Sequence, residues 1–105
     1  MAWVYLLLAG ICEIGWPLGL KLGWNDKGLQ AGWIVLAVVA MTASGALLML
    51  AQRVIPMGTA YGVWTGIGAV GAFVVGILLF GDAASPMRIV SILLIVAGIV
   101  GLKMA

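Results

Sequence analysis

The chain has 105 residues, of which 66% are apolar and only 8% are charged, and its formal net charge is +2. A soluble domain is about 45–50% apolar and about 25% charged, and a chain this short cannot bury so much apolar surface in one core. Five basic and three acidic residues are too few for a nucleic-acid-binding face, and one cysteine without any histidine excludes an internal disulfide and a CxxC metal site. The composition indicates a membrane protein with several spans, and we expect no metal or cofactor.

Four apolar runs fill most of the chain, each close to the roughly 20 residues that a transmembrane helix needs. They cover about residues 3–22, 29–51, 58–80 and 87–102. The connections between them are short and carry most of the charge, so consecutive spans must run antiparallel. The runs are continuous rather than alternating, which argues against a membrane β-barrel of at least about 8 strands. The sequence therefore predicts an all-α, four-helix transmembrane domain over residues 1–105.

Two prolines mark the starts of spans. Ser85 followed by Pro86 is typical of a helix N-cap with proline at the first helical position. Pro56 stands where the third span can begin without losing a hydrogen bond.

The basic residues are almost evenly divided between the two membrane surfaces. With four spans both termini share one side, which holds Arg53 and Lys103, and the other side holds Lys21, Lys27 and Arg88. Orientation normally follows an excess of Lys and Arg in short loops. Here either other signals set the orientation or the chain inserts both ways. In the second case two opposite copies can pair about an axis in the membrane plane, as the inverted repeats of larger transporters do.

Glu13 is the only acidic residue inside a predicted span. It lies roughly 15 Å deep at 1.5 Å per residue, close to the bilayer midplane. The basic residues within the predicted spans, Lys21 and Arg88, lie at the span ends, too far from Glu13 to neutralise it. A carboxyl group at that depth costs a few kcal/mol or more and by default is a functional residue facing a cavity; the alternative is a protonated side chain that only hydrogen-bonds a neighbouring helix. Removal from water disfavours the charged form, so the site can hold a proton or a cation, and their competition is sufficient for exchange transport.

Residues three and four positions from Glu13 share its helix face. Gly10 leaves room beside the carboxyl group, and Trp16 offers an indole N–H and a flat ring, either for a pocket or for ordinary packing. Pro17 removes the backbone hydrogen bond to the Glu13 carbonyl, and we expect a kink there. That carbonyl is then either a free acceptor or the partner of a Ser or Thr on another helix.

The other spans contribute further polar and aromatic candidates. Ser44 in the second span is a candidate hydrogen-bond partner for Glu13, unless it bonds its own helix. One face of the third span carries, at spacings of three and four, Tyr61, Trp64, Thr65 and Gly68. The rings of Tyr61 and Trp64 can attract a cation.

Glycines suggest where helices approach closely. A small-xxx-small ridge, which permits close packing, is formed by Gly58, Gly62 and Gly66. Gly66 and Gly68 form a candidate hinge in mid-membrane, although such glycines also occur in static helices. The fourth span has little polarity, and we expect it to pack a second copy of the chain through Gly98 and Gly101.

Almost the whole chain resembles the small multidrug resistance transporters. The resemblance rests on Gly10-Ile11-Cys12-Glu13-Ile14-Gly15-Trp16, on Lys21 at the end of the first span, and on Pro56-Met57-Gly58-Thr59-Ala60-Tyr61-Gly62-Val63-Trp64-Thr65-Gly66-Ile67-Gly68. Tryptophan three residues after the glutamate is similar to the guanidinium exporter subtype, whereas the broad quaternary-ammonium subtype usually has a small residue there.

The resemblance implies an antiparallel homodimer in the bacterial inner membrane that exports guanidinium in exchange for protons, and not an enzyme. It assigns the proton and substrate site to Glu13, Gly10, Trp16, Ser44, Tyr61 and Trp64, with Pro17, Lys21 and Thr65 in support. Pro17 replaces a residue that is usually small and not proline, so guanylurea and hydrophobic cations are also open as substrates. The alternative from another class, a small dual-topology ion channel, lacks a continuous polar path in these spans.

Overall fold

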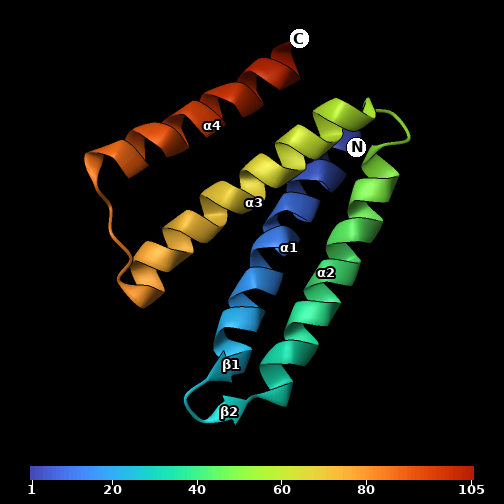
Figure 1. Cartoon of the computed structure of the whole chain (residues 1–105). Helices are drawn as coiled ribbons and strands as arrows, with labels where there is room; N and C mark the ends of the chain where they lie inside the picture. The colour runs from blue at the N-terminus through green and yellow to red at the C-terminus, as the bar shows by residue number, and fades with distance from the viewer.

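The computed structural model describes all 105 residues and contains four long helices in sequence. They are α1 (Ala2–Gly23), α2 (Ala31–Ala51), α3 (Met57–Phe80) and α4 (Pro86–Met104). Each of the four is long and apolar enough to cross a membrane, which confirms the predicted four-helix transmembrane fold. The two termini and the α2–α3 connection lie at one end of the molecule, and the other two connections lie at the opposite end (Figure 1).

Helix α1 is central to the packing. It runs along α2 on one side and along α3 on the other, whereas α2 and α3 contact each other very little (Figure 1). Helix α4 packs on α3 and has no buried residue. A bilayer solvates apolar side chains as well as a protein core does, so the exposed apolar faces of α2 and α4 can contact lipid or another chain.

A short hairpin, which the sequence did not reveal, joins α1 to α2. Strands β1 (Trp24–Asn25) and β2 (Gly28–Leu29) pair antiparallel, with Trp24 opposite Leu29. The backbone N–H of Lys27 donates to Asn25 Oδ1 at 2.8 Å, and Gly28 has a φ of 94°, which side chains disfavour. Since Leu29 belongs to this hairpin, α2 begins at Ala31, two residues after the predicted start.

The predicted cap at the start of α4 is present. Ser85 Oγ accepts a hydrogen bond from the backbone N–H of Arg88 at 3.4 Å, and Pro86 occupies the first turn. Helix α3 begins directly after Pro56 and ends at Phe80, and the next residue, Gly81, caps the helix in the left-handed region with a φ of 66°.

Two of the three ridge glycines form the surface on which α4 packs. A Cβ atom at Gly66 would lie 2.7 Å from Ile99 Cδ1, and one at Gly62 would lie 3.0 Å from Leu102 Cδ1. The third ridge glycine, Gly58, faces open space. Only residues without side chains therefore allow α4 to approach α3 this closely.

The remaining glycines singled out in the sequence have different surroundings. Helix α3 is continuous through Gly66 and Gly68, so a hinge there stays a prediction. A Cβ atom added at Gly98 or Gly101 would meet no other atom within 4 Å. That face of α4 is open, and its contact with a second chain also stays a prediction.

Candidate functional site

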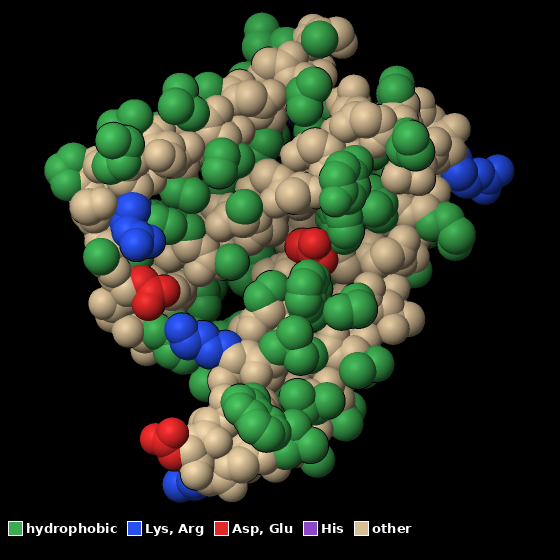
Figure 2. All heavy atoms as spheres, viewed as in Figure 1, with side chains coloured by type: hydrophobic (Ala, Val, Ile, Leu, Met, Phe, Trp, Pro, Cys, Tyr) green, Lys and Arg blue, Asp and Glu red, His purple; other side chains and the backbone are tan.

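Glu13 lies half-buried in the middle of α1, where α1 meets α3. The indole Nε1–H of Trp16, one turn further along, donates a hydrogen bond to Glu13 Oε1. The other carboxyl oxygen, Oε2, has no hydrogen-bond partner in the protein. Figure 2 shows one acidic side chain amid apolar groups in the middle of the visible face, while the other two lie near basic side chains at its edge.

Gly68 of α3 holds the Glu13 side chain against the neighbouring helix. A Cβ atom at Gly68 would lie only 2.5 Å from Glu13 Cγ, so any larger residue would displace the carboxyl group. One turn further along α3, the missing side chain of Gly71 makes room for Ile14. The two glycines therefore fix how deeply the Glu13 face of α1 sits against α3.

Ser44 joins three helices. Its hydroxyl group is fully buried, donates to the Ala9 carbonyl of α1 at 2.7 Å, and accepts from the indole Nε1–H of Trp64 in α3 at 2.7 Å. The predicted bond to Glu13 and the alternative bond within α2 are therefore both absent. Ser44 faces α1 at the level of Ala9, one turn before Glu13, and its single O–H donor is used there.

The aromatic residues of α3 form a pair beside this network. The ring centroids of Tyr61 and Trp64 lie 5.4 Å apart at an interplanar angle of 46°. The Ser44 hydrogen bond fixes Trp64, whereas Tyr61 is 56% exposed and Thr65 is also exposed. The predicted common face is thus divided: Trp64 and Gly68 contact the other helices, while Tyr61 and Thr65 remain accessible.

Two expectations for α1 need correction or completion. The space at Gly10 is not free, because a Cβ atom there would lie 2.6 Å from Ile67 Cγ2, and this side chain fills the position. Pro17 lies within α1, which continues to Gly23. No hydroxyl group donates to the Glu13 carbonyl, since the three that donate, Thr42, Ser44 and Ser91, bond other carbonyls.

The Gly68–Glu13 and Gly71–Ile14 contacts were missed from the sequence. The only available signal was the spacing of three between two glycines, which is common in membrane helices and does not say which helix they face.

Four membrane-spanning helices with a single acidic group at their centre define a small multi-pass membrane protein suited to carrying charged solutes. The sequence pattern of the Small Multidrug Resistance protein family matches residues 1–95. Guanidinium exporters of Citrobacter freundii, Salmonella typhimurium and Escherichia coli strain K12 are each 50% identical over 105 residues, which cover 100% of this chain and 98% of each relative. The chain belongs to the small multidrug resistance family, a family of transporters, and is a multi-pass protein of the bacterial inner membrane.

Replacing Ser44 with Ala should destabilise the protomer, because the part-buried indole N–H of Trp64 loses its acceptor. We expect a loss of about 1–3 kcal/mol, measured as a lower thermal unfolding temperature of the purified protein in detergent. Ser91→Ala is the matched control, since Ser91 is exposed and bonds only Met87 of its own helix at 2.8 Å. Equal unfolding temperatures for the two variants would contradict a stabilising role of the Ser44 link.

Proposed function

We propose that the protein is a proton-coupled antiporter that exports guanidinium or a small guanidinyl cation such as guanylurea, with proton and substrate competing for Glu13. The carrying observation is that Glu13 is the only acidic residue within the four helices and has no basic partner. The names of the relatives at 50% identity, all guanidinium exporters, support the substrate class.

The geometry around Glu13 suits a flat cation with N–H donors. The indole of Trp16 orients the carboxyl group through Oε1 and leaves Oε2 free to accept from a ligand or to carry a proton. A guanidinium ion presents its donors in one plane, in the arrangement that a carboxylate accepts best. The tilted rings of Tyr61 and Trp64 supply aromatic faces on α3, the helix whose Gly68 packs against Glu13.

The transporter proposed here is an antiparallel homodimer with one Glu13 from each protomer. A lone protomer leaves the Glu13 carboxyl half-exposed and α4 without a buried residue. Exposure of a carboxyl group to hydrocarbon is costly, and a second copy covering the site removes that cost. The nearly even distribution of basic residues between the two surfaces supports the opposite orientation of the copies.

Glu13→Gln should abolish guanidinium transport while leaving the protein folded. The amide retains an acceptor for Trp16 but carries no negative charge and exchanges no proton. The measurement is the transient current evoked by guanidinium in proteoliposomes on a solid-supported membrane, with Asp26→Asn, an exposed acid in the hairpin turn, as control.

Three results would redirect the proposal. Current in Glu13→Gln equal to wild type would refute the role of Glu13. Wild-type current with tetraethylammonium but not guanidinium would favour the hydrophobic-cation exporters of the same family. A sustained guanidinium current that an imposed proton gradient cannot drive would favour a channel.

The apparent affinity for guanidinium should fall as the pH falls. In the proposed competition, a cation that binds at Glu13 must displace any proton held there, so a higher proton concentration weakens cation binding. The expected loss is up to about tenfold per pH unit for each proton displaced. Quenching of tryptophan fluorescence, to which Trp16 beside Glu13 should contribute, can be titrated with guanidinium from about pH 4 to 9, which includes the ordinary range of carboxyl groups. An affinity that does not change with pH would exclude competition.

Both orientations should be needed for activity. Asp26→Lys with Ala83→Lys adds positive charge to one end of the protomer, and Gln52→Lys with Val54→Lys adds it to the other; all four positions are exposed. Each double variant should insert in one orientation only and be inactive alone, and co-expression should restore guanidinium export from cells. Full activity of either double variant alone would contradict the antiparallel dimer.

A further inference from the structure

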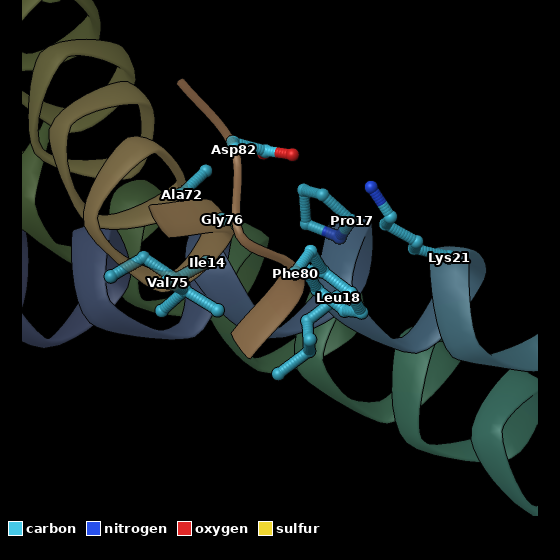
Figure 3. A pocket seen from close by; sticks show the side chains of 9 residues that line it. All are labelled: Ile14, Pro17, Leu18, Lys21, Ala72, Val75, Gly76, Phe80 and Asp82. Atoms are coloured by element: carbon cyan, nitrogen blue, oxygen red, sulfur yellow. The ribbon is translucent and has the colours of Figure 1, made fainter. Parts of the chain in front are cut away.

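A second polar feature lies outside the Glu13 site. A pocket of about 160 Å³ opens between α1, α3 and the α3–α4 connection. Its lining includes Pro17 and Lys21 of α1, Phe80 at the end of α3, and Asp82 of the connection. Figure 3 shows the Asp82 carboxylate and the Lys21 side chain reaching over Pro17 from opposite sides of the pocket.

This pocket continues the α1–α3 contact outward from Glu13. On α1, Pro17 and Lys21 follow Glu13 at successive spacings of four, so all three share one helix face. On α3 the residue that touches Glu13 is Gly68, and Ala72 and Gly76 of the pocket lining follow it at the same spacing. Lys21 lies eight residues from Glu13, or about 12 Å along the helix axis. The pocket therefore occupies the seam between Glu13 and one membrane surface.

Asp82 occupies a position that helix electrostatics disfavour. It follows Gly81, the residue that caps the C-terminus of α3, where the macrodipole repels negative charge. Its backbone N–H donates to the Gly76 carbonyl at 3.1 Å, and its carboxylate lies against the Cα of Gly76, where any side chain would collide with it. The local fold thus holds this carboxylate over the pocket.

The Asp82 carboxylate has no partner in the protein. It accepts no side-chain hydrogen bond and forms no ion pair, although the pocket also contains a lysine. Lys21 instead places its ammonium group over the ring of Phe80, 4.4 Å from the centroid. A carboxylate and an aromatic face, the two groups that attract a flat cation, therefore line one pocket.

The charges at this end of the protomer suggest that the Asp82 carboxylate attracts cations. Three basic residues, Lys21, Lys27 and Arg88, outnumber the two acids, Asp26 and Asp82. An approaching cation meets a net positive end, and only a local negative charge at the mouth of the seam offsets this repulsion.

We propose that Asp82 and Phe80 form an outer docking site for the guanidinium-type substrate, from which the cation passes along the α1–α3 seam to Glu13. The bound cation takes the Asp82 carboxylate and displaces the Lys21 ammonium from the face of Phe80. The pocket volume of about 160 Å³ leaves room for a guanidinium ion, because about 10–15 Å³ on the same measure is enough for one water molecule. This inference rests on the proposed function. It adds Asp82 as a residue that speeds the capture of the cation and does not change the equilibrium affinity for guanidinium at Glu13.

The test compares Asp82→Asn with Asp26→Asn, a matched acid-to-amide change at the same end but outside the pocket. At about 10 mM ionic strength and subsaturating guanidinium, Asp82→Asn should lower the initial transport current about two- to fivefold, and Asp26→Asn should leave it near wild type. The difference should vanish near 1 M salt, where the screening length falls from about 30 Å to about 3 Å. Lys21→Gln should change the low-salt current in the opposite direction, because it removes the competing cation.

Equilibrium guanidinium affinity, measured by tryptophan fluorescence, should stay within about twofold of wild type in Asp82→Asn, since Glu13 is unchanged. If wild type transports guanidinium but the two amide variants give equal currents at low salt, the docking site is refuted and the proposed function stands. A loss of current in Asp82→Asn that persists at high salt means that Asp82 has a structural role, and this result also refutes the docking site. Absence of any guanidinium current in wild type overturns the proposed function, and the docking site with it.

Discussion

The arrangement of this protomer depends on placing one carboxyl group in the middle of a membrane. A carboxyl group there is costly, and the chain offers it no basic side chain. The structure supplies one hydrogen bond, from the Trp16 indole, and close packing against Gly68, while Oε2 is left without a partner. The carboxyl group is therefore oriented by a hydrogen bond but has no basic partner.

Glycines on both sides of α1 make that orientation possible. Toward α2, Gly15, Gly19 and Gly23 would each place an added Cβ within about 3 Å of an atom of α2. Toward α3, Gly68 and Gly71 of α3 accept the side chains of Glu13 and Ile14, and Gly10 of α1 accepts Ile67. Hydrophobic burial contributes little to helix association in lipid, so close backbone approach of this kind sets the helix positions. The rotation of α1, and with it the direction of Glu13, follows from which helix presents glycine at each contact.

The same packing leaves the protomer incomplete on one side. Helix α4 rests on Gly62 and Gly66 of α3 and buries none of its own residues, and Tyr61 remains exposed beside the fixed ring of Trp64. The pocket lined by Asp82 and Lys21 likewise contains a polar group that is held in place but has no partner. Its glycine-held Asp82 carboxylate is unpaired, while Lys21 contacts an aromatic ring nearby. In both places the fold positions a polar group and gives it no partner for all of its polar atoms within the protomer.

The sequence by itself determined the number of spans, the single acid among them, the cap at Ser85 and the family, because apolar run length and capping are local properties. Only the tertiary structure decided that Ser44 bonds Ala9 and Trp64 rather than Glu13, that Ile67 fills the space at Gly10, and that Gly68 receives Glu13. These contacts depend on how each helix is rotated about its axis. In a soluble helix the apolar stripe reveals that rotation, but here apolar residues predominate on every side of each helix. The rotation is then fixed by contacts between glycines and side chains on different helices, which no local pattern records.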